Sequence, residues 1–138
     1  MSEPTPESNK DIAIRLYRET FDNHDLGIAD KLLAPGFIFH NAGSEIRGRE
    51  GWRAFAGDWL TGFPDLGLTV DFAMAEDDRV LLHWRGGGTH TGEFRGTPAT
   101  GGRISASGLT LFRLSSGRIE EMWDETEAFG ELQALAVT

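Results

Sequence analysis

The chain has 138 residues, of which 39% are hydrophobic and 25% charged, a composition typical of one globular domain. A net charge of −9 argues against nucleic-acid or anionic-membrane partners, because those surfaces attract basic proteins. The absence of cysteine excludes disulfides, thiolate nucleophiles and cysteine metal ligands, and it is compatible with a cytoplasmic location.

The N-terminal third is predicted to hold a leader and two helices. Residues 1–7 contain two prolines and no apolar run, so we expect a disordered leader, no signal peptide, and one domain over 8–138. Ser8 is placed to cap a helix over 9–22, whose apolar residues recur at helical spacing. Asp25 is placed to cap a short second helix that ends at Pro35.

The middle of the chain changes from helical to strand periodicity. A short strand over 37–40 ends at Asn41-Ala42-Gly43, and a third helix is expected over 49–62, before Pro64. Beyond Pro64 the apolar residues alternate with period two, which predicts a half-buried strand. No stretch approaches the roughly 20 apolar residues that span a bilayer.

Four strands are expected in the second half, largely joined by hairpins. After the strand that begins near Leu66, the strands are predicted over 80–91, 103–114 and 118–125, with a last short helix over 128–136. Helices first and a meandering sheet afterwards indicate an α+β fold, with the helices covering one face of a twisted sheet. Such a sheet encloses a cone-shaped cavity.

Six segments, in order, carry a resemblance to a known family. They are Leu33-Ala-Pro-Gly-Phe-Ile-Phe-His40, Gly48-Arg-Glu-Gly51, Phe63-Pro-Asp-Leu66, Gly88-Thr-His-Thr-Gly-Glu-Phe94, Gly96-Thr-Pro-Ala-Thr-Gly101 and Gly117-Arg-Ile-Glu-Glu-Met-Trp-Asp124. With these segments the chain resembles the SnoaL-like polyketide cyclases and ester cyclases of the nuclear-transport-factor-2-like superfamily, over about residues 9–135.

The resemblance implies a cone-shaped fold with an apolar pocket, a homodimer or homotetramer formed through the sheets, and a hydrophobic small-molecule substrate. It also implies ring closure by intramolecular aldol condensation without a cofactor. Three departures stand out: Arg95 replaces a usual apolar residue, Ala99 a usual proline, and Glu127 a frequent aspartate. Fold by itself does not name a reaction.

Asp124 is the first catalytic candidate. The resemblance places an acid–base aspartate here, and burial beside large rings would raise its pKa toward the range of a general base. Its alternative is a solvent-facing acid at a strand end, and Glu127 is the alternative functional acid. Strand parity sends Trp123 and Asp124 to opposite faces, unless a bulge turns both inward.

His90 and His40 are the other two catalytic candidates. His90 lies in the Gly-Thr-His-Thr-Gly segment, and its imidazole could donate to a substrate oxygen or an enolate. The alternative is a histidine satisfied by the surrounding backbone. His40 ends the first strand and is expected as a second pocket donor. His83 has the opposite parity from His90 and is expected on the outer face, and His24 is expected in a solvated loop.

Four aromatic residues are the predicted substrate contacts: Trp84, Phe112, Trp123 and Phe63. Core packing is the alternative for each of them, because strand or helix periodicity already explains their positions. No metal or cofactor is expected, because the four histidines lack metal-binding spacing and the two lysines lie in early helical regions. The alternative is a metal site assembled in space from His40, His90 and Asp124.

Other functions remain open at this point. The same fold hosts epoxide hydrolases and ketosteroid-isomerase-like enzymes, and a hydrolase would require a second buried acid with an arginine partner. Arg85 and Glu93 are the residues to inspect for that role. The remaining class is a non-catalytic protein that binds a hydrophobic ligand.

Overall fold

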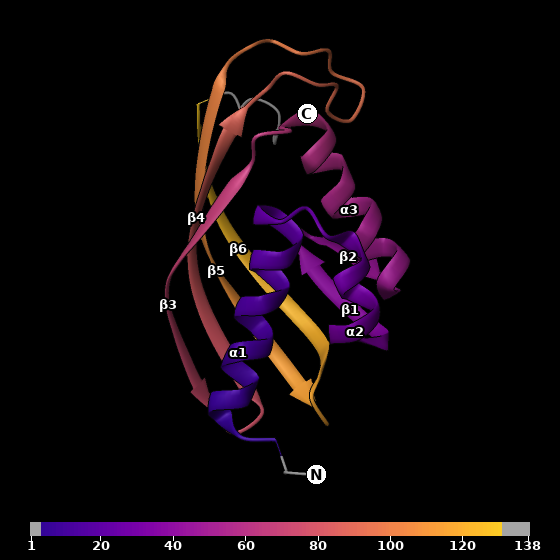
Figure 1. Cartoon of the computed structure of the whole chain (residues 1–138), viewed down its shortest axis with the longest axis vertical. Coiled ribbons are helices and arrows are strands. Elements are labelled where there is room, and N and C mark those ends of the chain that lie inside the picture. The colour runs from indigo at the N-terminus through magenta and orange to yellow at the C-terminus, as the bar shows by residue number, and fades with distance from the viewer. Residues whose placement is uncertain (1–3, 131–138) are drawn as a thin grey trace.

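The computed structural model describes residues 4–130, which form three α-helices and a six-stranded mixed sheet that does not close into a barrel (Figure 1). The helices are α1 (Pro6–Tyr17), α2 (Ala29–Leu32) and α3 (Gly48–Gly62), and the strands are β1 (Leu33–Asn41), β2 (Ser44–Arg47), β3 (Gly67–Glu76), β4 (Arg79–Thr89), β5 (Arg103–Ser115) and β6 (Arg118–Gly130). This is the expected α+β class.

The strands lie in the order β2-β1-β6-β5-β4-β3. All neighbouring strands are antiparallel except β1 and β6, which are parallel. The helices lie on one side of the curved sheet (Figure 1). We call the face toward the helices the inner face and the opposite one the outer face.

The first helix begins earlier than predicted. Thr5 is the N-cap, and its side chain accepts from the Ser8 backbone N–H at 3.1 Å while Ser8 Oγ accepts from the Thr5 backbone at 2.9 Å. This reciprocal capping box allows Pro6 at the first helical position, where no N–H is needed. A π-helical turn over Arg18–Asp22 continues the helix, within the predicted range.

Strand β2 was missed by the sequence analysis. Ala42 and Gly43 both have positive φ, at 51° and 81°, the conformation of a type I′ hairpin turn. Such a turn reverses the chain into a second strand, whereas Asn41-Ala42-Gly43 was interpreted only as a strand end. The helix predicted over 128–136 is wrong for 128–130, which belong to β6, and its remainder lies outside the described residues.

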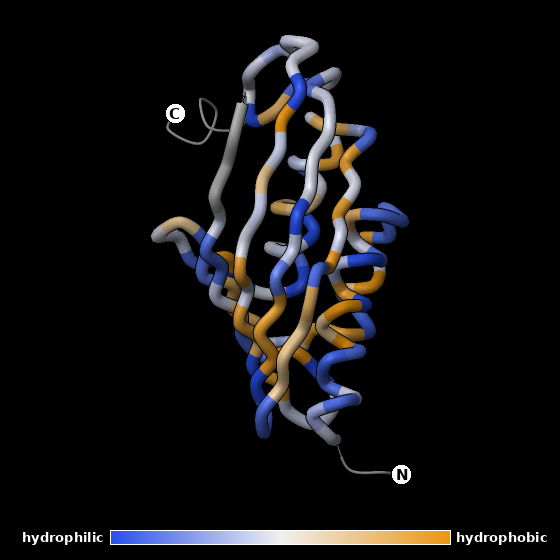
Figure 2. The backbone as a smooth tube through the Cα atoms, turned by 90° about the vertical axis from the view of Figure 1, so that its left-hand side faces the viewer, coloured by the Kyte–Doolittle hydropathy of each residue, from blue (hydrophilic) through white to orange (hydrophobic). Residues whose placement is uncertain are grey.

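The core joins aromatic side chains from the helices and the inner face. Trp52 of α3 is fully buried, and its ring lies 5.5 Å from that of Phe39 and 6.3 Å from that of Tyr17. In Figure 2 the apolar colour gathers along the lower parts of the strands and the helices behind them. We call this part of the inner face, where the buried aromatic side chains pack, the core end.

Candidate functional site

Asp124 lies on the inner face of β6, in one row with three residues of neighbouring strands. The register aligns Leu82, Thr110, Asp124 and Asn41 across β4, β5, β6 and β1. The Thr110 hydroxyl donates to Asp124 Oδ1 at 2.8 Å, and the Thr126 hydroxyl donates to Oδ2 at 2.7 Å. Each carboxylate oxygen is thus held by a threonine.

Thr110 links Asp124 to two aromatic side chains. Its Oγ1 lies 2.8 Å from the Tyr17 hydroxyl, and it accepts a hydrogen bond from Trp84 Nε1 at 3.0 Å. Thr110 is fully buried and Tyr17 almost so. Helix α1 and strands β4, β5 and β6 therefore meet at one hydroxyl group beside Asp124.

The environment makes Asp124 a stronger base than an exposed aspartate. Desolvation raises the pKa of Asp124 above its ordinary value, although the hydrogen bonds from Thr126 and Thr110 lower it in part. Desolvation and the charge of Asp124 also raise the pKa of Tyr17, which keeps its phenol protonated. Asp124 is half-buried by surface area, so it stays accessible from one side.

Side-chain size changes abruptly at Asp124. The row toward the core end holds Val80, Phe112, Met122 and Phe39, all at most 1% exposed. The next row on the other side holds Trp84, Gly108 and Thr126, with the Trp84 ring against Gly108, and the row after it holds Gly86 with Ala106. Asp124 therefore stands near the point where the filled part of the inner face, which the Trp84 ring extends over Gly108, gives way to small residues.

The structure does not bring His90 together with Asp124. His90 follows β4, eight residues beyond Leu82 of the Asp124 row, or roughly 26 Å of extended strand at ~3.3 Å per residue. Its Nδ1 lies 3.0 Å from Thr100 Oγ1, while its fully buried Nε2 has no hydrogen-bond partner. His90 packs in a separate apolar cluster with Phe63, at 5.2 Å between rings.

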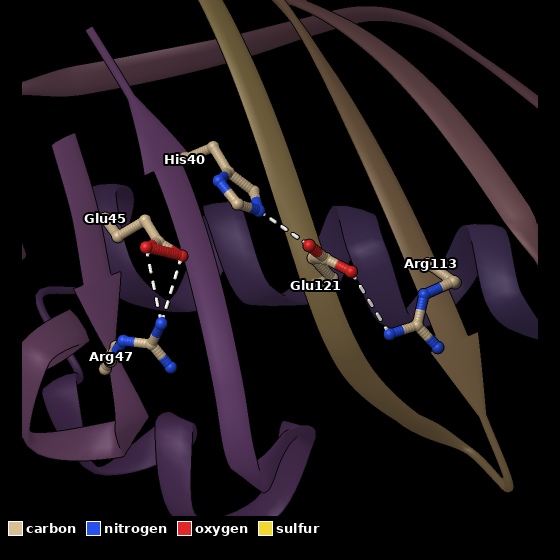
Figure 3. A network of polar contacts seen from close by, with 5 residues as sticks. All are labelled: His40, Glu45, Arg47, Arg113 and Glu121. Carbon is tan, nitrogen blue, oxygen red and sulfur yellow. Dashed lines mark hydrogen bonds and ion pairs between the residues drawn. The ribbon is translucent and has the colours of Figure 1, made fainter. Parts of the chain in front are cut away.

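His40 and Trp123 lie on the outer face, away from Asp124. Their rings stack at 5.4 Å, and His40 Nε2 lies 2.6 Å from Glu121 Oε2. Figure 3 shows the network that Glu121 completes with Arg113. The expected pocket position of His40 is therefore not observed, and of the two parity alternatives the structure has Trp123 facing away from Asp124.

The remaining aromatic candidates occupy three different settings. Trp84 lies in the Asp124 network, Phe112 is sealed in the filled row, and Phe63 belongs to the His90 cluster. Glu127 is at an outer-face register position opposite Ser107, and its side chain lies outside the described residues. His83 lies on the outer face as expected, with Nδ1 at 2.9 Å from Asp71 Oδ2.

Among residues 4–130, no group of three His, Cys, Asp or Glu side chains is arranged to hold a metal ion. Within the same range, no helix is both long and apolar enough to cross a bilayer.

The family model of the SnoaL-like polyketide cyclases matches residues 11–135. The chain belongs to this family. Solved structures also include a similar protein that is described as SnoaL-like. A protein of Jannaschia sp. CCS1, described as a proposed SnoaL-like polyketide cyclase, is 28% identical, with TM-score 0.80 over 99% of this chain and 94% of that one. No curated protein matches the sequence.

Two further structural neighbours come from Streptomyces. IdmH of Streptomyces antibioticus, a proposed polyketide cyclase, is 31% identical with TM-score 0.75, over 93% of this chain and 96% of its own. AclR of Streptomyces galilaeus, a proposed hydroxylase, is 28% identical with TM-score 0.78, over 89% and 91% of the two chains. Members of similar structure thus carry names of different reactions.

Sequence reasoning missed Tyr17, Thr110 and Thr126 as site residues. Tyr17 is one of the apolar residues that recur at helical spacing within 9–22, so its hydroxyl received no role, and threonines are common in strands. One signal was available: Thr110 and Thr126 share the alternation that turns Asp124 inward. This shared alternation could have been used only if the pairing of β5 with β6 had been known.

Proposed function

We propose that this protein is a cofactor-independent cyclase in which Asp124 removes a proton from the carbon next to a substrate carbonyl. The observation that supports this most directly is the half-buried Asp124 carboxylate, whose pKa is raised by desolvation, at the edge of the small-residue part of the inner face. A general base works best when its pKa approaches the working pH.

The proposed reaction balances without any added oxidant or reductant. Asp124 takes the proton, the electron pair of the broken C–H bond moves onto the carbonyl oxygen, and an enolate forms. The enolate carbon then attacks a second carbonyl of the same molecule, which forms the ring bond. Asp124 returns its proton to the resulting alkoxide and is ready for another turnover.

The substrate we propose is flat and hydrophobic. Beyond the Trp84 ring, which covers Gly108, the small residues Gly86 and Ala106 leave the sheet surface low where a planar molecule would lie. Trp84 borders this surface, whereas Phe112 is fully buried and lies on the filled side. We therefore assign substrate contact to Trp84 rather than to Phe112.

The hydrolase alternative receives less support. It requires an arginine beside the catalytic acids, but the Arg85 guanidinium pairs with Asp71 at 2.9 Å on the outer face. On the inner face the hydroxyls of Thr110 and Thr126 donate hydrogen bonds to Asp124. These donors suit a carboxylate that takes a proton and returns it.

Hydrogen–deuterium exchange at the acidic carbon of an aromatic β-keto ester tests the proposal, because it requires only the first step. In deuterated buffer, wild-type protein should accelerate exchange, followed by NMR, and Asp124→Asn should reduce that acceleration by about 10²- to 10⁴-fold. Circular dichroism controls for folding. Equal exchange by the two proteins would refute the role of Asp124, and no acceleration by wild type would favour the ligand-binding alternative.

We also propose that two copies of the chain associate through the outer face. The exposed large hydrophobic residues of the described range, Phe72, Met74 and Leu109, are 48%, 61% and 41% exposed, and all belong to this face. Trp123 extends the same apolar surface. Light scattering should give a dimer mass for wild type and a lower mass for Met74→Glu; a monomeric wild type would refute the association.

A further inference from the structure

We propose that Asp124 takes the substrate proton on Oδ2, that Thr110 positions the carboxylate by holding Oδ1, and that Thr126 stands at the reacting oxygen. This inference rests on the proposed role of Asp124 as base and names the atom that reacts. It assigns functions to two threonines, one buried and one exposed, that hold the two oxygens of one carboxylate.

The hydrogen-bond capacity of Thr110 decides the role of Oδ1. A threonine hydroxyl has one hydrogen to donate and two lone pairs to accept with. The Trp84 indole N–H can only donate, so it takes one lone pair, and the ionised Asp124 can only accept, so it takes the hydrogen. Tyr17 must then donate its phenolic hydrogen to the second lone pair, at 2.8 Å.

This saturation gives the buried side of the site one fixed arrangement. If Thr110 turned its hydrogen from Oδ1 to the Tyr17 oxygen, the charge-assisted bond to Asp124 would be lost, and lone pairs of Thr110 and the carboxylate would face each other. All three partners come from different elements, α1, β4 and β6, and Thr110 is 0% exposed. Oδ1 is therefore held toward the filled core rather than toward incoming substrate.

Oδ2 is bound by an exposed donor, whereas the donor to Oδ1 is buried. Its donor Thr126 is exposed and lies in the next row, on the side of the small residues. An exposed hydroxyl can rotate about its Cβ–Oγ1 bond. When Oδ2 gains the proton from the substrate carbon, Thr126 can turn from donor to acceptor, and it donates again once the proton has left for the alkoxide.

The titratable groups around Asp124 are Tyr17 from α1, whose pKa the charge of Asp124 raises, and Glu125 from its own strand, whose charge raises the pKa of Asp124. β5 and β4 present Thr110 and Trp84, and the register of β1 presents Asn41. The hydrogen bond from Thr126 lowers the pKa of Asp124 more than the one from Thr110 does. Removal of the Thr126 hydroxyl should therefore weaken the acid more than removal of the Thr110 hydroxyl.

Two pairs of variants test the inference, each with a conservative control. Thr126→Val should raise the pKa of Asp124, measured by the carboxyl carbon NMR titration without substrate, and Thr126→Ser should leave it near wild type. Thr110→Val should lower kcat for exchange of the β-keto ester by about 10- to 100-fold, because the carboxylate is no longer held in place, and Thr110→Ser should restore it. An unchanged titration in Thr126→Val would overturn the role of Thr126, and an unchanged kcat in Thr110→Val that of Thr110.

Atomic-resolution diffraction at pH values below and above the titration identifies the protonated oxygen. We expect the Cγ–Oδ2 bond to be the longer one in the acid form, and both bonds to become similar in the ionised form. A longer Cγ–Oδ1 bond in the acid form would overturn the assignment. The titration and the bond lengths need no substrate, so a wrong assignment of the protonated oxygen is distinguished from a failure of the base role, which fully active Asp124→Asn protein would show.

Discussion

The indole of Trp84 lies directly against Gly108 on the neighbouring strand. A Cβ built on Gly108 would lie 2.6 Å from Trp84 Cζ2, and also 2.7 Å from the Glu125 carbonyl oxygen. Only glycine leaves room for the ring, and from this position Nε1 reaches Thr110 at 3.0 Å. One absent side chain thus allows the hydrogen-bond network behind Asp124 to form.

Gly108→Ala should therefore displace Trp84 and disturb the site. We expect a loss of about 1–3 kcal/mol in the free energy of unfolding, measured with urea, because a methyl group is forced into filled space. Gly36→Ala is the matched control, since a Cβ there meets nothing within 4 Å. Similar stability of the two variants would contradict the close contact.

Asp124→Asn should be at least as stable as wild type at neutral pH. Burial is the main cause that raises the folded-state pKa of Asp124, so ionisation costs stability. Below the unfolded-state pKa the group is protonated in both states and contributes nothing, and above the folded-state pKa the full cost applies. The melting temperature of Asp124→Asn, relative to that of wild type, should therefore increase as pH rises from 4 to 7. A melting temperature of wild type that increases relative to that of Asp124→Asn over that range would contradict this expectation.

Ionisation of Glu121 on the outer face should stabilise the fold, whereas ionisation of Asp124 should destabilise it. The hydrogen bond from His40, followed by that from Arg113, lowers the pKa of Glu121, so this group stabilises the fold above its ordinary pKa near pH 4.3 and loses that contribution as pH falls below it. Glu121→Gln should lower stability at pH 7 by at most about 1 kcal/mol, and the difference should shrink below pH ~4.

Glu45→Gln is the matched control for that experiment. Glu45 pairs with Arg47 at 3.2 Å in the same view (Figure 3), but the two side chains are 48% and 66% exposed. Such exposed pairs contribute little, so urea titrations of this variant and wild type should coincide. A larger loss of unfolding free energy in Glu45→Gln than in Glu121→Gln would show that burial does not decide how much each ion pair stabilises the fold.

His90→Leu separates the two histidine interpretations. Because His90 lies in the Phe63 cluster, far along β4 from Asp124, we expect kcat for exchange to fall less than about tenfold, against about 10²- to 10⁴-fold for Asp124→Asn. Exchange should be normalised to the folded fraction from circular dichroism. A loss equal to that of Asp124→Asn would bring His90 into the chemical step.

Much of the local structure was predictable because its causes are local. The spacing of Trp52, Phe55 and Trp59 defines α3, and Ser116-Gly117, with φ of 52° and 78°, makes the predicted tight turn between β5 and β6. Alternation also placed His83 on the face opposite the core. These features depend on neighbours within a few residues.

The composition and the patterns of the sequence by themselves determined the α+β class, the α3 helix and the late strands, and the family resemblance named Asp124 as the candidate acid. Only the tertiary structure decided which face of β6 looks inward. Parity separates Trp123 from Asp124 but does not say which is inside, because that depends on β6 lying between β1 and β5. This pairing of distant segments places Asp124 beside Thr110 and sends His40, with Trp123, to the outer face.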